Sequence, residues 1–135
     1  MNLTNLTNLC FMELIYRDEV FGMLGACFEV YNEAGSGFLE EVYQQPLEHE
    51  LGLRHIPFVS KPKLEIRYKG ILLSKKYEPD FVTHSKIIME IKAVSALNDE
   101  HRAQVLNYLK ASSFKVGLLV NFGKTKVLEY ERIIR

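Results

Sequence analysis

The sequence predicts a single α/β domain in which two helices are followed by three strands, a helix and two further strands. Three observations predict this fold class. Apolar residues recur at helical spacing early in the chain, over residues 17–34. Alternating or continuous apolar runs typical of strands occur several times between residues 61 and 134. No linker divides the 135 residues, and 47% of them are hydrophobic, so the chain can bury a core.

The first two elements are predicted to be helices. The first covers residues 17–34, with Asp18 as its cap and Gly35 at its end. Its predicted buried face consists of Val20, Leu24, Cys27, Phe28 and Tyr31. The second helix is predicted over residues 38–51. Pro46 lies inside it and should kink it or shift its register, because proline lacks the N–H that a helix interior uses.

The stretch "KPKLEIRYKG" predicts a strand over residues 61–69 with one apolar face and one largely basic face. Lys69 and Gly70 form the turn that ends it. The basic face is predicted to consist of Lys61, Lys63, Arg67 and Lys69. Two interpretations stay open for this face: contact with the phosphates of a nucleic acid, or an edge strand that lysines protect from aggregation.

The remaining elements follow from short patterns. Extended segments are predicted over residues 72–82 and 86–93, joined by "THS". A helix begins after a cap at Asn98 or Asp99 and runs to about Ala111. The continuous apolar run "KVGLLVNF" predicts a buried strand, and "KVLEYERII" predicts a final strand.

Composition narrows the functional classes. Lys and Arg together number 17, as do Asp and Glu, so any attraction to a polyanion must come from a local patch. No stretch has the length of a membrane span, and no membrane partner is expected. We expect residues 1–12 to be a disordered or mis-annotated extension, residues 13–135 to form the domain, and the location to be cytoplasmic. Cys10 and Cys27 should be neutral thiols in a reducing compartment.

The segments around residues 80 and 90 carry the candidate chemistry. In "IIMEIKAV", a period of two places Glu90 and Lys92 on one face of an otherwise apolar strand. If the preceding hairpin turns about Ser85 with a three-residue loop, Asp80 lies directly across from Glu90 on that face. Two opposed carboxylates repel, so we expect a compensating cation, either Lys92 or a divalent metal held by oxygen ligands. The alternative interpretation is a salt-bridged patch on an exposed strand.

The helix that follows carries a polar stripe of His101, Gln104 and Tyr108, spaced three and then four residues apart. The neighbouring apolar sector, expected to face the core, consists of Val105, Leu106 and Leu109. The stripe has two interpretations. Its members are boundary residues, or they hold a phosphate backbone or orient a catalytic lysine through hydrogen bonds.

Several motifs together resemble a known family. "GFLEEVY" is similar to the Gly-x-x-Glu-x-x-Tyr signature of a family of small bacterial and archaeal proteins named for it, within the PD-(D/E)XK nuclease superfamily. "PDF", "MEIKAV", "HRAQVLNYLKAS" and "VGLLVNFG" match the rest of that pattern, so the resemblance spans residues 14–134. It implies a restriction-endonuclease-like core, a central mixed sheet flanked by helices. By position it assigns the site to Glu40, Asp80, Glu90 and Lys92, supported by Gln104 and Tyr108.

The resemblance implies a metal-dependent nuclease that hydrolyses phosphodiester bonds, with DNA favoured over RNA. Mg²⁺, with Mn²⁺ as the alternative, would be held by Asp80, Glu90, Glu40 and the backbone carbonyl of Ile91. Lys92 would position water or stabilise charge developing on the phosphate. Supporting contacts to the lysine or the nucleic acid are expected from Tyr43, His101, Gln104, Tyr108, Lys61, Lys63 and Arg67.

Two expectations concern the helix that carries Glu40. Tyr43 should lie on the same side as Glu40, whereas Glu41 should point elsewhere. Glu40 also has a simpler interpretation, as a first-turn partner of the helix dipole. The alternative functions are a catalytically silent module that binds nucleic acid or protein, and an accessory subunit of a homo-oligomer or larger complex.

Overall fold

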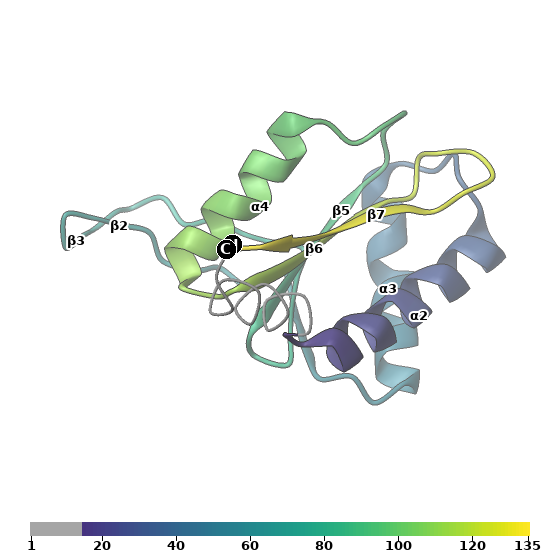
Figure 1. Cartoon of the computed structure of the whole chain (residues 1–135), viewed down its shortest axis with the longest axis horizontal. Helices are drawn as coiled ribbons and strands as arrows, with labels where there is room; N and C mark the ends of the chain where they lie inside the picture. Colours follow the sequence, from purple (N-terminus) through teal and green to yellow (C-terminus); the bar gives the residue numbers. More distant parts are fainter. Residues whose placement is uncertain (1–14) are drawn as a thin grey trace, which may run out of the picture.

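The computed structural model describes residues 15–135, which form one mixed β-sheet with helices on both of its faces (Figure 1). In chain order the elements are α2 (Arg17–Ala34), the 3₁₀ helix η1 (Glu40–Tyr43), α3 (Gln44–Leu53), β1 (Phe58–Ser60), β2 (Arg67–Tyr68), β3 (Ile71–Leu72), β4 (Phe81–Thr83), β5 (Ile87–Lys92), α4 (Asp99–Ser112), β6 (Val116–Asn121) and β7 (Glu129–Ile134). The predicted fold class is therefore confirmed.

The main sheet has the strand order β1-β4-β5-β6-β7. β5 and β6 are parallel and α4 connects them, whereas every other neighbouring pair is antiparallel. Three strands of this sheet precede α4 and two follow it, as many as predicted, but the first of them is β1 and not the strand predicted over residues 61–69. β5 lies in the middle and is buried from Ile87 to Ile91, so its side chains are held by neighbours on both sides.

The helices α2 and α3 cover one face of the sheet and α4 covers the other (Figure 1). Met89 and Ile91 of β5 belong to the core under α2 and α3. Ile88 belongs to a second core with Val105 and Leu109 of α4. Because successive strand residues point to opposite faces, the polar residues at alternate positions after Ile88 are directed toward α4.

The helix α2 has the predicted bounds but a different buried face. Its buried residues are Val20, Met23, Ala26, Cys27 and Val30. Phe28, expected in the core, is 39% exposed and packs edge-on against Tyr130 of β7. Gly35 ends the helix with a φ of 71°, as predicted, whereas the N-cap is Tyr16 and Asp18 lies within the first turn. Likewise, Leu106 of α4 is 41% exposed rather than buried.

The second predicted helix is divided in two, and this corrects the expected effect of Pro46. The chain forms η1 over four residues and then α3, which begins at Gln44. Pro46 is thus the third residue of α3, inside a first turn whose N–H groups have no partner within the helix. A proline there removes no helical hydrogen bond, so Pro46 fits the first turn of α3 and does not kink the helix.

The predicted strand over residues 61–69 is not part of the main sheet. These residues belong to an arm, residues 61–77, that leaves the sheet after β1 and returns before β4, with the β2–β3 hairpin at its tip (Figure 1). Lys69 and Gly70 form the predicted turn, and both have positive φ angles. The predicted basic face is divided, because Lys61 and Lys63 line different pockets. Near the tip of the arm, Arg67 pairs with Glu65 and Lys69 lies over the Tyr68 ring.

Some expectations fall partly or wholly outside the described residues. The extension predicted for residues 1–12 and the thiol of Cys10 both lie there. Cys27 is fully buried, and burial raises the pKa of its thiol to about 12, so the thiol is neutral as predicted. Across residues 15–135, no helix combines the length and the apolar character needed to cross a membrane.

Candidate active site

Asp80 and Glu90 face each other across the β4–β5 hairpin. The strands pair Phe81 with Met89 and Thr83 with Ile87, which leaves a three-residue loop centred on Ser85 and confirms the predicted register. Each carboxylate accepts a hydrogen bond from the backbone of the opposite strand. The N–H of Asp80 donates to Oε1 of Glu90 at 2.8 Å, and the N–H of Ile91 donates to Oδ2 of Asp80 at 2.8 Å.

The environment of this pair keeps Glu90 away from solvent. Glu90 is 4% exposed, and burial together with the charge of Asp80 raises its pKa to about 8. Burial also raises the pKa of Asp80, against the opposing effects of the Ile91 N–H and of Lys92. The alternative of a salt-bridged patch on an exposed strand is therefore wrong, because Glu90 lies in the central strand and is buried.

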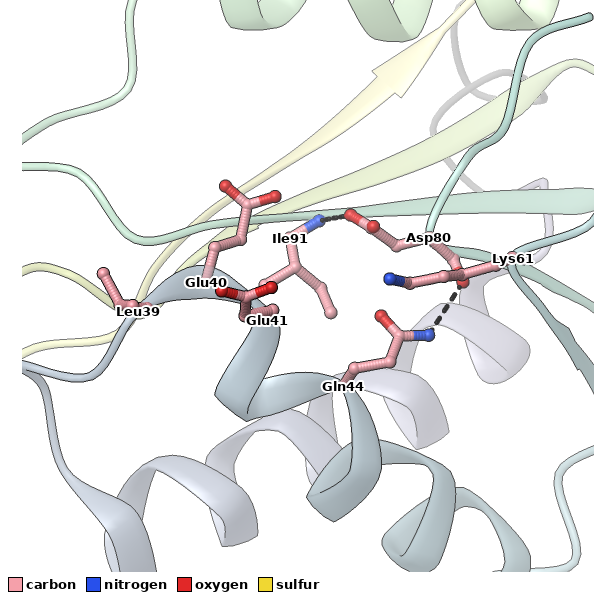
Figure 2. A pocket seen from close by; sticks show the side chains of 7 residues that line it. All are labelled: Leu39, Glu40, Glu41, Gln44, Lys61, Asp80 and Ile91. Atoms are coloured by element: carbon pink, nitrogen blue, oxygen red, sulfur yellow. Dashed lines mark hydrogen bonds between the residues drawn. The ribbon is translucent and has the colours of Figure 1, made fainter.

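Glu40, from η1, lies in the same pocket as Asp80. A pocket of about 400 Å³ is lined by Leu39, Glu40, Glu41, Gln44, Lys61, Asp80 and Ile91. Figure 2 shows the amine of Lys61 directed toward the carboxylates of Glu40, Glu41 and Asp80. Partial burial and the charge of Asp80 raise the pKa of Glu40, while Lys92 and Lys61 oppose this shift. Glu41, expected to point elsewhere, lines the same pocket.

The chain before η1 positions Glu40. Gly35 and Gly37 adopt φ angles of 71° and 107°, which turn the chain sharply after α2. Tyr43 secures that turn: its hydroxyl donates to the carbonyl of Gly35 at 2.7 Å, and its ring stacks on Phe122 at 4.5 Å. Tyr43 is fully buried, so the structure places it in the core and not beside Glu40 in the pocket.

Gln44 is a pocket residue that sequence reasoning missed. Its side-chain amide donates to the backbone carbonyl of Asp80 at 3.2 Å (Figure 2). The same amide donates to Oγ of Ser60 at 2.7 Å. Oγ of Ser60 in turn donates to Glu48 at 2.6 Å. These bonds tie α3 to the chain that precedes β4, and thus to Asp80. In the sequence, Gln44 follows Glu40 by four residues, and this helical spacing indicates that the two side chains share one side.

Lys92 is held by α4 rather than by the carboxylates. Its Nζ donates to Oε1 of Gln104 at 2.7 Å, and the amide of Gln104 donates to the hydroxyl of Tyr108 at 3.0 Å. Tyr108 stacks on Tyr77, with ring centroids 5.0 Å apart. Burial and the charge of Glu90 raise the pKa of Tyr108, so its hydroxyl stays protonated. This chain of contacts fixes the ammonium group on the face of β5 that carries Glu90.

Three predicted supporting residues lie apart from this group. His101 completes a capping box: its Nδ1 accepts from the N–H of Asn98 at 3.1 Å, while Asn98 accepts from the N–H of His101. The His101 ring therefore caps the N-terminus of α4. Lys63 lines a different pocket, and Arg67 lies on the exposed arm.

The donor set suits a hard divalent cation, although no metal cage is preassembled. Across residues 15–135, no three His, Cys, Asp or Glu side chains are grouped so as to hold a metal ion. Mg²⁺ needs only one or two protein carboxylates, because it keeps several of its waters. Asp80 and Glu90 each use one carboxylate oxygen for a backbone N–H, and within the described residues the second oxygen of each makes no hydrogen bond.

The raised pKa of Glu90 predicts how stability depends on pH without metal. In the folded protein Glu90 keeps its proton up to about pH 8, whereas in the unfolded chain it loses the proton above the ordinary pKa of 4.5. The proton therefore stabilises the folded state at low pH, and this stabilisation is lost as pH rises through about 8. The free energy of unfolding should fall between pH 5 and 9, by at most about 5 kcal/mol. Urea titrations in EDTA should show this fall for the native protein and a clearly smaller fall for Glu90→Gln, because Asp80 and Glu40 also have raised pKa values.

Two controls accompany these titrations. Glu100→Gln, at an exposed position of α4, should keep the pH profile of the native protein. Mg²⁺ should restore stability at high pH in the native protein but much less in Glu90→Gln. A native profile that does not fall with pH would contradict the buried, protonated Glu90.

Comparison with known proteins places the fold. The family model described as the PD-(D/E)XK nuclease superfamily matches residues 17–133. Among curated proteins, none matches the chain. The crystal structure of SSO0001 is similar, with a TM-score of 0.56 and 22% sequence identity. The match covers 70% of this chain and 49% of that chain, so this chain spans about half the length of SSO0001. At this identity the similarity shows the fold alone.

Proposed function

Because the chain belongs to the PD-(D/E)XK nuclease superfamily, we propose that it hydrolyses phosphodiester bonds in nucleic acid with the help of a divalent metal ion. The observation that carries the proposal is the opposed pair of Asp80 and Glu90, with Lys92 on the same face of β5. Burying two carboxylates side by side costs stability, so a fold that keeps them is expected to use them.

The residues divide into three roles. Asp80, Glu90, Glu40 and the backbone carbonyl of Ile91 would hold Mg²⁺ or Mn²⁺. A bound divalent ion supplies a water of lowered pKa and polarises a phosphate oxygen. The ammonium group of Lys92 would stabilise negative charge on the phosphate as the bond breaks, because Gln104 holds it in place before substrate binds. Lys61 would attract the phosphate to the pocket.

The raised pKa values of Glu90 and Asp80 make metal binding depend on pH. Glu90 and Asp80 hold protons more strongly than exposed carboxyls, so the metal must displace protons to bind. We therefore expect metal affinity and cleavage to increase as pH rises toward about 8. The resemblance favours DNA over RNA as the substrate.

The test is a cleavage assay with labelled single- and double-stranded DNA and RNA, in Mg²⁺, Mn²⁺ or EDTA. We expect cleavage with a metal and none in EDTA, and loss of cleavage in Asp80→Asn. Calorimetry adds a second measurement: Mn²⁺ binding should weaken at least about tenfold in Glu90→Gln. No cleavage of any substrate with either metal would overturn the proposal and favour the silent binding module.

A further inference from the structure

A second polar pocket lies on the arm that leads out of the active site. Its volume is about 330 Å³, and it is lined by Lys63, Ser74, Lys75, Lys76 and Glu78. Three lysines and a single acidic residue thus line one hollow. Across residues 15–135, none of these three lysines makes an ion pair. Such an excess of positive charge around a hollow favours an anionic ligand.

The backbone of the arm builds this pocket through a bulge. Toward the tip, Leu73 donates to Ile66 at 2.9 Å; toward the base, Leu64 pairs with Tyr77. Residues 74–76 therefore lie opposite Glu65 alone. A bulge bends its strand and redirects side chains, and bulges are frequent beside active sites. Here the bulged residues Ser74, Lys75 and Lys76 all line the pocket, together with Lys63 from the other strand.

Both ends of the arm are fixed to the candidate active site. At one end, the N–H of Lys61 donates to the carbonyl of Asp80 at 2.9 Å. At the other end, Tyr77 is 7% exposed and stacks on Tyr108, which accepts from Gln104, the partner of Lys92. The arm tip projects from the body (Figure 1), but its base is held in place. Lys63 is two residues from Lys61, so their Cα atoms lie within about 7 Å.

We propose that Lys63, Ser74, Lys75 and Lys76 form a second phosphate subsite, which binds the backbone of the nucleic acid one or two nucleotides from the bond that is cut. The proposal rests on the proposed function. Lys61 lines the active-site pocket and Lys63 lines the second pocket, so one strand can place a phosphate in each. Because the Cα atoms of the two lysines lie within about 7 Å, their side chains can contact phosphates one or two nucleotides apart on the same strand. Contacts to phosphate carry no sequence information, so this subsite sets affinity and register.

The test compares binding of a fluorescein-labelled oligonucleotide, single- or double-stranded, in EDTA. In Lys75→Ala/Lys76→Ala we expect the Kd to rise about tenfold at 150 mM salt, because two phosphate contacts are lost. The slope of log affinity against log salt should become shallower by about 1.4 to 1.8. In cleavage assays the same variant should raise KM and leave kcat within about twofold.

Matched variants separate a specific subsite from general charge. Lys75→Arg/Lys76→Arg keeps the charge and should bind as the native protein does. Lys110→Ala/Lys115→Ala removes the same charge from exposed positions in α4 and just before β6, at the end of that strand farther from Lys92. It should change affinity less than twofold. An unchanged salt slope in Lys75→Ala/Lys76→Ala, or an equal loss in the Lys110→Ala/Lys115→Ala control, would overturn the subsite.

The two proposals fail in different ways. If the native protein cleaves with Mg²⁺ but the Lys75→Ala/Lys76→Ala variant binds and cleaves normally, the subsite is wrong and the nuclease proposal stands. If the variant loses affinity while no metal supports cleavage by the native protein, the pocket binds a backbone phosphate, but the nuclease proposal and the placement of the pocket beside a cut bond are wrong. If the substitutions weaken binding of inorganic phosphate but not of the oligonucleotide, the pocket is a small-anion site and the subsite is wrong.

Discussion

Lys92→Ala should lower kcat/KM for phosphodiester cleavage by about 1000-fold, the loss expected when one preorganised stabilising group is removed from a reacting phosphate. Nζ of Lys92 is fixed at 2.7 Å from Oε1 of Gln104, so the ammonium group needs no reorientation when substrate binds. Lys92 is only partly buried and contributes little to the core, so the variant should fold. Single-turnover cleavage kinetics, with circular dichroism as the folding check, measure both effects.

Gln104→Ala separates positioning from direct action. It leaves the ammonium group in place but removes the acceptor that orients it, so we expect a loss of about tenfold to 100-fold. Because Gln104 acts through Lys92, the double variant Lys92→Ala/Gln104→Ala should be no slower than Lys92→Ala alone. Tyr108→Phe, which removes the next hydroxyl, should cost less than about fivefold. Additive losses, or a Lys92→Ala enzyme with more than a tenth of native activity, would contradict this assignment.

The sequence was sufficient to place Asp80 opposite Glu90, and the reason is geometric. Strand alternation has a period of two, and a loop of known length fixes the register of a hairpin. The prediction depended on a three-residue loop about Ser85, and the structure has that loop and register. The roles of these residues in catalysis stay predictions. Superfamily membership is confirmed, whereas the narrower family named for its Gly-x-x-Glu-x-x-Tyr motif stays an expectation.

Where the sequence misled, tertiary contacts decide the outcome. Tyr43 has the spacing of a pocket residue, but its ring fills the core against Phe122, a partner 79 positions away that no local pattern reveals. The arm alternates like a strand of the main sheet, yet β1 pairs with β4 directly and leaves the arm outside the sheet. The capping role of His101 was predictable from the sequence. A capping box pairs an N-cap residue, here Asn98, with a side-chain acceptor three residues later, here His101.

Gly123→Ala should lower the free energy of unfolding by about 3 to 5 kcal/mol, because a Cβ at this position has no space. It would lie 2.4 Å from both the N and the O atoms of Val94 and 2.6 Å from the carbonyl carbon of Ala93. These are backbone atoms and cannot move aside as a flexible side chain would. Urea denaturation measures the loss directly, and a decrease below about 1 kcal/mol would contradict the close contact.

The control is Gly52→Ala, which makes the same chemical change in α3. A Cβ at Gly52 meets no atom within 4 Å in the described structure, and the residue is helical. Alanine forms helix more readily than glycine, so this variant should gain up to about 1 kcal/mol. Opposite signs for the two substitutions would show that space, and not the loss of glycine flexibility, causes the effect.

The Gly123→Ala variant should also lose cleavage in the fraction that remains folded, because the crowded atoms hold the end of β5. Asn121 is fully buried; its side chain accepts from the N–H of Val94 and donates to the carbonyl of Val94, both at 2.9 Å. The N–H of Phe122 donates to the carbonyl of Lys92 at 2.8 Å. An added methyl group forces this segment away from β6 and displaces Lys92 from Gln104. Loss of stability and loss of cleavage therefore share one cause, the close approach of the chain beyond β6 to Ala93 and Val94, the two residues that follow Lys92.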